Sequence, residues 1–304
     1  MSSVARNPGP RTKSAERPAR SPGVHVRIAA TTDVGRVRER NEDAIVVRDL
    51  GRRTSPPALE RIDIGPLGVL VAVADGMGGA DRGDVASAML VDHLTRSLED
   101  ASLDTPPEVA LTNAARVAHE AIWSAGEQAG RRMGSTLTAA IVQHDVVTIA
   151  QVGDSRAYVL RNGHMLQLTR DQSLVQSLVE AGVLDEETAE TSPYRNVILQ
   201  AVGHQEMLSP AITRLELRAR DCLLLCSDGL TGLVRPNEIA RVVRRSFRLD
   251  IAAERLVALA NERGGDDNVS VVLAGIGGDL PSAKEEEHVA STLSVLSPYV
   301  GRLP

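Results

Sequence analysis

Residues 67–79 read LGVLVAVADGMGG. The first eight are small or branched apolar residues, as in strands bounded by Gly, Asp or Asn. Because successive side chains of a strand point to opposite faces, a run that is apolar at every position predicts a strand buried on both faces. The run stops at Asp75-Gly76, so we expect a carboxylate where this buried strand ends.

Further short runs of the same character cover residues 135–142, 146–152, 156–160, 222–226 and 269–276. The breaks between the first three are too tight for parallel pairing, which predicts antiparallel neighbours, and Asn162-Gly163 supplies a favoured hairpin turn. Apolar residues recur at helical spacing around 85–98 and 111–122. Strand and helix groups that segregate in this way predict an α+β protein, with two stacked antiparallel sheets and helices outside them.

The bulk composition is that of one large domain. The chain has 304 residues, of which 42% are apolar, enough for a large core. A net charge of -6 does not favour nucleic acid or an anionic membrane surface as the main partner. No stretch approaches the roughly 20 apolar residues of a membrane span. The N-terminus has no apolar signal core, so we expect a cytoplasmic location.

The remaining segments have weaker signals. Residues 1–24 combine prolines with basic side chains, which predicts a disordered basic arm. Residues 50–66 are expected to form an irregular surface loop. Residues 279–304 are expected to form a polar tail with one weak helix over about 288–296.

A small insert is expected over residues 171–195, beside the sheets. Asp171 can cap a helix that carries Leu174 and Leu178, and Gly182 can end that helix. A further strand-like run follows near residues 197–199.

Five short acidic motifs stand where apolar runs begin or end, at residues 38–43, 75–79, 153–156, 227–229 and 266–268. For one Asp-Gly pair taken alone, a turn is the commoner explanation. Several such motifs at strand ends instead predict clustered carboxylates, which repel one another unless cations lie between them. Asp75 and Asp228 are each followed by glycine, which lets the backbone approach a ligand closely. Oxygen ligands without nearby His or Cys favour Mg²⁺ or Mn²⁺ over zinc.

Seven motifs follow one another along the chain: Arg38-x-x-Asn41-Glu42-Asp43, Asp75-Gly76-Met77-Gly78-Gly79, Gly134-Ser135-Thr136, Val152-Gly153-Asp154-Ser155-Arg156, Arg195-Asn196-Val197-Ile198, Ser227-Asp228-Gly229-Leu230 and Asp267-Asn268-Val269-Ser270. In this order they resemble the motifs of the metal-dependent Ser/Thr protein phosphatases of type 2C, in their short bacterial form. The resemblance covers about residues 26–276. It implies one domain over 25–278, a four-layer α/β/β/α sandwich, and a centre of two Mn²⁺ or Mg²⁺ ions at one end.

The resemblance also implies which residues hold the metals. Asp75 bridges both ions, and the Gly76 carbonyl binds one of them. Asp228 and Asp267 bind the other. Two such ions share a water and lower its pKa towards ~7, so that hydroxide attacks phosphorus directly.

Four more residues have roles implied by the resemblance. Glu42 and Asp43 act directly or through bound water, and Asp154 matches a third, weaker metal site. Arg38 matches the phosphate-binding arginine, whose planar fork suits phosphate. A solvated charge beside Arg36 remains the alternative explanation for Arg38.

The function implied is hydrolysis of phosphoserine and phosphothreonine in proteins, opposing a bacterial Ser/Thr kinase, with a monomer favoured. One alternative is a catalytically silent module of the same fold that binds phosphoproteins. Another is an enzyme narrowed to one small phosphorylated regulator. Loss of Asp75, Asp228 or Asp267 would favour the silent module, and all three are present.

Four positions depart from the family pattern: Met77, Ala80, Asp84 and Gln172. None of them removes an implied metal ligand. They leave open the substrate-side surface and the role of the insert.

Overall fold

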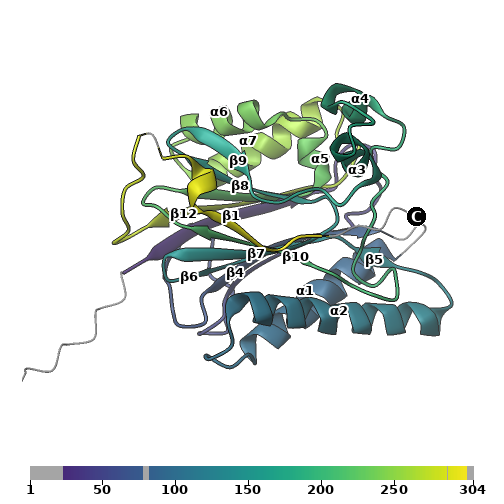
Figure 1. The fold of residues 1–304 in the computed structure, drawn as a ribbon, viewed down its shortest axis with the longest axis horizontal. Coiled ribbons are helices and arrows are strands. Elements are labelled where there is room, and N and C mark those ends of the chain that lie inside the picture. The colour runs from purple at the N-terminus through teal and green to yellow at the C-terminus, as the bar shows by residue number, and fades with distance from the viewer. Residues whose placement is uncertain (1–22, 78–81, 286, 300–304) are drawn as a thin grey trace, which may run out of the picture.

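Two antiparallel sheets lie face to face, with helices on both outer faces (Figure 1). The computed structural model describes residues 23–77, 82–285 and 287–299. The predicted α+β sandwich is therefore confirmed.

Each sheet is built from strands that are distant in sequence. The first has the order β3 (Arg61–Asp63), β1 (His25–Asp33), β12 (Val269–Gly277), β11 (Cys222–Cys226), β8 (Arg156–Arg161) and β9 (His164–Gln167). The second has the order β13 (Leu293–Ser297), β10 (Ala211–Glu216), β7 (Val146–Val152), β6 (Leu137–Gln143), β4 (Val69–Met77) and β2 (Asp43–Asp49), and β5 (Gly134–Ser135) pairs with the end of β4.

The helices form the two outer layers. The second sheet is covered by α1 (Gly83–Glu99) and α2 (Pro107–Ala129). The first sheet is covered by α5 (Asp228–Thr231), α6 (Pro236–Arg245) and α7 (Leu249–Glu262). A small insert carries α3 (Leu174–Glu180) and α4 (Glu186–Thr191), and a short 3₁₀ turn spans Val289–Thr292.

Strand β4 is buried along both faces, as its apolar run predicted. Val69, Val71 and Val73 pack into the core between the sheets. Leu70 and Ala72 point the other way, into the core beneath α1 and α2. Alternation thus places every second side chain in a different core, which explains why no polar residue interrupts the strand.

Local signals account for the limits of several elements. Helix α2 begins with Pro107 at its first turn and ends at Gly130, whose φ of 62° is left-handed. Asn162 and Gly163 both have positive φ, at 50° and 82°, and form the predicted hairpin turn between β8 and β9.

Three expectations for the insert and the long loop are wrong in detail. The expected loop 50–66 contains β3, which pairs with β1. Ser173, not Asp171, caps α3 by accepting the Gln176 N–H, because Arg156 holds Asp171 in a bidentate ion pair. The expected strand near 197–199 is a single bridge to Ser173.

The C-terminal segment does not form the weak helix expected over 288–296. It makes the 3₁₀ turn and then β13, which pairs with the edge strand β10. Free backbone groups of an edge strand offer a template for pairing, and here they outweigh weak helical spacing. The boundary at residue 278 stays a prediction, and residues 1–22 of the expected arm lie outside the described residues.

A buried ion pair fastens this segment to the sandwich. Arg161 and Asp221 have side chains that are each 1% exposed, and their atoms approach to 2.7 Å. Arg161 also donates to the Thr292 hydroxyl at 2.8 Å. Across residues 23–77, 82–285 and 287–299, no helix is both long and apolar enough to cross a membrane.

Candidate metal centre

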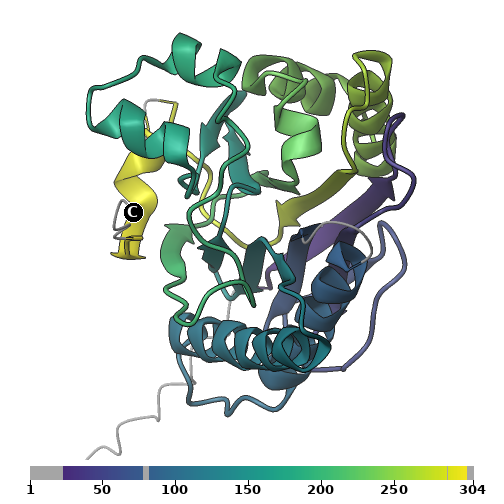
Figure 2. The same ribbon diagram turned by 90° about the vertical axis from the view of Figure 1, so that its right-hand side faces the viewer.

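The acidic motifs converge at one end of the sandwich, which Figure 2 shows face on. A cavity of about 300 Å³ opens there. It is lined by Arg38, Glu42, Asp75, Gly76, Met77, Thr136, Asp154, Asn196, Ile198, Asp228 and Asp267. We call this end of the molecule the mouth.

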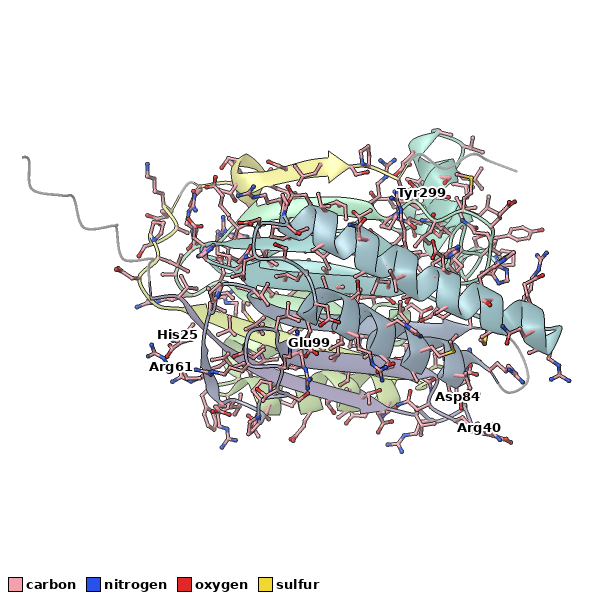
Figure 3. The ribbon with its side chains drawn as sticks, turned by 90° about the horizontal axis from the view of Figure 1, so that it is seen from below. His25, Arg40, Arg61, Asp84, Glu99 and Tyr299 are labelled. Carbon is pink, nitrogen blue, oxygen red and sulfur yellow. The ribbon has the colours of Figure 1, made fainter. Side chains whose placement is uncertain are left out.

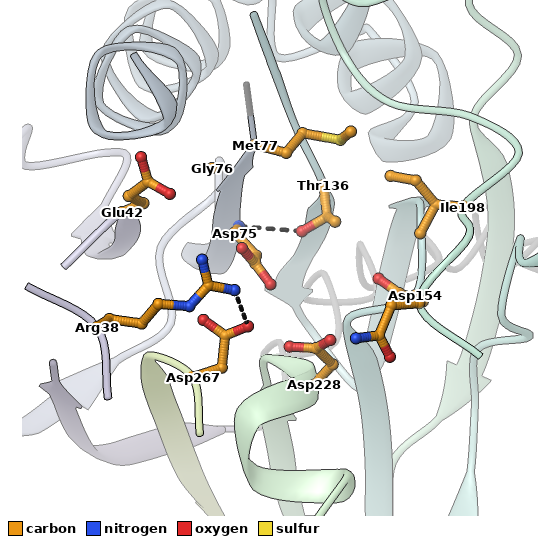
Figure 4. A pocket seen from close by; sticks show the side chains of 11 residues that line it. Arg38, Glu42, Asp75, Gly76, Met77, Thr136, Asp154, Ile198, Asp228 and Asp267 are labelled. Atoms are coloured by element: carbon orange, nitrogen blue, oxygen red, sulfur yellow. Dashed lines mark hydrogen bonds and ion pairs between the residues drawn. The ribbon is translucent and has the colours of Figure 1, made fainter. Parts of the chain in front are cut away.

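Asp75 lies at the end of β4, at the floor of the cavity (Figure 4). Its backbone N–H donates to the Thr136 hydroxyl at 3.0 Å, and its carbonyl accepts the Ser135 hydroxyl at 3.0 Å. Asp43, at the start of β2, is paired in register with Asp75. Strand pairing alone therefore places two carboxylates side by side.

Gly76 and Gly229 are required by close packing and not by a turn. Neither has a positive φ, because Gly76 lies in β4 and Gly229 lies in α5. A Cβ on Gly76 would stand 2.0 Å from the carbonyl oxygen of Gly83, and one on Gly229 would stand 2.0 Å from that of Asn268. The turn explanation for these two Asp-Gly pairs is thereby excluded, and each glycine instead allows two backbone segments of the chain to pack closely.

Asn268 organises the loops on the other side of the cavity. Its side-chain oxygen accepts the Glu42 N–H at 2.7 Å. Its amide nitrogen donates to the carbonyls of Val34 and Arg40, both at 2.9 Å. One buried amide thus holds Glu42 against the segment that carries Asp267.

Arg38 lies across the rim, with its side chain 49% exposed. Its Nη2 donates to Asp267 Oδ2 at 2.6 Å, as Figure 4 shows. The other guanidinium nitrogens of Arg38 form no hydrogen bond to a side chain among the described residues, so they remain available to an anion at the mouth.

Burial and mutual repulsion raise the pKa of the clustered carboxyls. Burial raises the pKa of Asp43 to about 7 and that of Asp154 to about 8. The pKa of Asp75 is raised well above its usual value, first by burial and then by the charge of Asp43. Burial and the charge of Asp267 raise the pKa of Asp228. Without cations, Asp43 and Asp154 therefore titrate near neutral pH.

The donor set fits hard divalent cations. Asp43 Oδ1 and Asp228 Oδ1 are buried and have no hydrogen-bond partner. Unpaired buried oxygens are rare in native proteins and point to an ion or water. Within the described ranges, no three His, Cys, Asp or Glu side chains already meet as a closed ligand set. In keeping with this, Asp267 is turned towards Arg38.

Asp154 follows a turn that buried glutamines hold in place. Gln172 accepts the Gly153 N–H at 2.9 Å and donates to the carbonyl of Gln151 at 3.2 Å. The same Gln172 oxygen accepts an N–H of Gln200 at 2.9 Å. The side chains of Gln172 and Gln200 therefore tie the turn before Asp154 to the segments at both ends of the insert.

The insert also supplies one wall of the cavity. Asn196 and Ile198 line it, and Ile198 is bridged to Ser173 at the start of the insert. Leu174 N–H donates to the Val197 carbonyl at 2.8 Å. The two stems of the insert are thus joined beside the mouth.

The structure brings most of the predicted site residues together. Seven line the cavity, namely Arg38, Glu42, Asp75, Gly76, Asp154, Asp228 and Asp267. Asp43 lies behind them, 9% exposed, and accepts the Ser227 hydroxyl at 2.8 Å. Thr136, Asn196 and Asn268 belong to the seven motifs, but the motif pattern alone indicates no role for them. Ala80 lies outside the described residues.

Comparisons with known proteins agree with this geometry. The family model of Protein phosphatase 2C matches residues 61–262. The chain belongs to this family. It is 36% identical over 247 residues to a serine/threonine phosphatase, stp, of Listeria monocytogenes, which covers 80% of this chain and 92% of the relative.

Solved members of the Protein phosphatase 2C family share the fold. The crystal structure of the serine/threonine phosphatase PstP/Ppp of Mycobacterium tuberculosis is 35% identical, with a TM-score of 0.71, and covers 84% of this chain and 99% of its own. The catalytic domain of PstP has also been solved in complex with two manganese ions, at 33% identity, a TM-score of 0.71 and the same coverage.

Proposed function

We propose that this chain hydrolyses phosphoserine and phosphothreonine in proteins, using two Mn²⁺ or Mg²⁺ ions held at the mouth. The observation that carries the proposal is the cluster of carboxylates that line the cavity or lie directly behind it, with two buried oxygens, Asp43 Oδ1 and Asp228 Oδ1, left unpaired. Its membership of the Protein phosphatase 2C family supports the same reaction.

Asp75, Asp228 and Asp267, with the Gly76 carbonyl, would hold the two ions. When bound, such ions supply an activated water at neutral pH and offset phosphoryl charge. The donors come from β4, the start of α5 and the segment before β12. Because β4 belongs to the second sheet, whereas α5 and the segment before β12 adjoin strands of the first, the sandwich itself fixes the spacing of the ligands.

The supporting residues orient these ligands. Thr136 and Ser135 fix both backbone groups of Asp75. Asp43, lying behind Asp75, adds negative charge that favours a cation in the cavity. Glu42 faces the cavity beside Gly76, whose N–H donates to the Glu42 carbonyl at 3.1 Å.

Arg38 is proposed to bind the phosphoryl group. One nitrogen is held by Asp267, which aims the planar guanidinium at the cavity. The remaining donors match phosphate oxygens in a bidentate arrangement. Asp154 is proposed to hold a third, weaker ion, on the side of the cavity that the insert covers.

The partners follow from the reaction. Substrates would be phosphorylated proteins, including targets of a Ser/Thr kinase, and we propose a cytoplasmic monomer.

The test uses the purified full chain and a phosphothreonine peptide. Turnover should require added Mn²⁺ or Mg²⁺ and should stop with chelator. Asp75→Asn keeps the shape but removes the charge, so turnover should fall to background and calorimetric Mn²⁺ binding should weaken. Asp84→Asn, on α1 outside the cavity, is the control. Peptide binding with Mn²⁺ but without phosphate release would favour the silent module instead.

A further inference from the structure

The last turn of α6 and the connection that leads into α7 expose an unusual set of side chains. Residues 241–248 read RVVRRSFR, and they contain Phe247, the single phenylalanine of the chain. Phe247 is 89% exposed. The four arginines of this segment are exposed as well. Single exposed apolar side chains are common on protein surfaces. Here, however, the exposed aromatic ring stands among four exposed arginine side chains. We call residues 241–248 the cationic turn.

Only part of this charge is neutralised by neighbours. Arg248 pairs with Asp250, which follows it at the start of α7. Glu238 lies within the field of Arg241 but is held by Arg263 at 2.6 Å. Arg244 and Arg245 have no carboxylate partner among the residues that the structure describes. The cationic turn therefore carries net positive charge, although the whole chain is negative.

The cationic turn lies at the end of the sandwich away from the mouth. Leu249 packs against Gly275, near the last residues of β12, whereas β12 begins at the mouth with Val269. The β8–β9 turn, which also points away from the mouth, approaches Arg244. Figure 1 shows α6 at the left of the upper layer and the insert at the right. Figure 3 shows the same two ends, with His25 and Arg61 at one and Arg40 and Asp84 at the other.

Phe247 protrudes from the surface of the cationic turn, because 89% of the residue is exposed. Neither the mouth cavity nor the second cavity, which lies at the β6–β7 turn, is lined by any residue of the cationic turn. An extended acidic peptide gains specificity from pockets for its side chains, and neither of these two cavities lies at the cationic turn. A fluid anionic surface can instead shape itself around a protruding ring and several guanidinium groups.

We propose that the cationic turn docks the protein on an anionic membrane surface, with Phe247 inserted at the level of the lipid headgroups. The arginines would bind lipid phosphates, since each cation near such a surface adds to the attraction. Because the mouth lies at the opposite end, docking would leave the cavity free for substrate. The net charge of the whole chain, -6, does not reveal this local positive patch.

The experiment measures binding of the full chain to vesicles by co-sedimentation. Vesicles that contain phosphatidylglycerol should bind the protein, and pure phosphatidylcholine vesicles should not. Arg244→Gln/Arg245→Gln should weaken binding about thirtyfold, since each lost charge near the surface accounts for roughly fivefold. Phe247→Ser should weaken vesicle binding at low and at high salt alike, because salt screens charges but not the insertion of an apolar ring.

Matched controls separate docking from general surface charge. Arg131→Gln/Arg132→Gln removes two exposed arginines just after α2, and Met207→Ser removes a side chain that is 80% exposed. Both should bind vesicles like the parent chain. All variants should keep the parent rate on a small aryl phosphate, which also shows that they are folded.

Two results would overturn the proposal. One is equal binding by the parent and by Arg244→Gln/Arg245→Gln. The other is binding to polyglutamate or to duplex DNA, but not to phosphatidylglycerol vesicles, which would assign the cationic turn to an acidic protein or to nucleic acid.

Discussion

Replacing Gly76 by alanine tests whether the backbone of the site is as closely packed as the structure shows. The added Cβ would stand 2.0 Å from the Gly83 carbonyl oxygen and 2.6 Å from that of Glu42. Both neighbours are backbone atoms, so neither can rotate aside. Ordinary contact begins at 3.4 Å, so β4 and the start of α1 would have to move apart by a further 3.4 − 2.0 = 1.4 Å.

This displacement acts directly on the proposed ligands. Gly76 offers its carbonyl, and its neighbours Glu42 and Asp75 line the same cavity. Misplacement of reacting groups by about 1 Å can lower a rate ~100-fold. We therefore expect Gly76→Ala to lose at least about 100-fold in kcat/KM. Overpacking of this kind also costs about 1–3 kcal/mol of unfolding free energy.

The assay compares Gly76→Ala with Gly65→Ala. A Cβ on Gly65 meets nothing within 4 Å, and its φ is not positive, so this variant should behave like the parent. Rates on a phosphothreonine peptide, calorimetric Mn²⁺ affinity and urea unfolding are measured for both. The reasoning is refuted if Gly76→Ala retains more than half of the kcat/KM and the Mn²⁺ affinity of Gly65→Ala.

Three further predictions concern charge and positioning. Burial raises the pKa of Asp43 to about 7 and that of Asp154 to about 8, so the metal-free fold binds more protons than the unfolded chain and should lose stability as pH rises from about 4 to 8. Thermal unfolding at a series of pH values measures this loss, and saturating Mn²⁺ should reverse the trend. A metal-free stability that does not change with pH would contradict the prediction. Arg38→Ala should raise KM and lower kcat, and Arg38→Lys should recover part of both losses. Arg36→Ala should change kcat/KM little. If Arg38→Ala leaves KM and kcat unchanged, Arg38 does not contact the phosphoryl group. Gln172→Met keeps the volume but loses three hydrogen bonds to the turn before Asp154 and to Gln200, so it should weaken the lower-affinity Mn²⁺ binding about tenfold, and unchanged titration would show that the turn holds itself.

The parts of the fold that the sequence predicted have strong local patterns. The apolar run of β4 and the Asn162-Gly163 turn specify their conformations over a few residues. Strand β3 has no such pattern, because its three residues are extended only through pairing with β1. Helices α6 and α7 have apolar spacing, with Ile239, Val243 and Leu256 buried, but sequence reasoning did not use it.

The site could be predicted as a set of ligands but not as an arrangement. Each acidic motif is local, so the carboxylates could be named from the chain alone. Their supports depend on partners far away in sequence, as Asn268 does on Glu42 across 226 residues. The same reason explains Asp171, whose carboxylate suits a helix cap locally but is held by Arg156 in the folded chain.

The position of β12 has a consequence for folding during synthesis of the chain. In the first sheet β12 lies between β1 and β11, and it pairs Thr31 with Val271, 271 − 31 = 240 positions apart. Closing so long a loop is slow, and its entropic cost is offset only when both strands exist and can pair. A nascent chain that has not yet reached Val269 therefore leaves β1 and β11 with facing open edges, and it lacks the pairing that sets Asp267 at the mouth. The newly made chain would therefore remain inactive until β12 has been synthesised and has paired with β1 and β11.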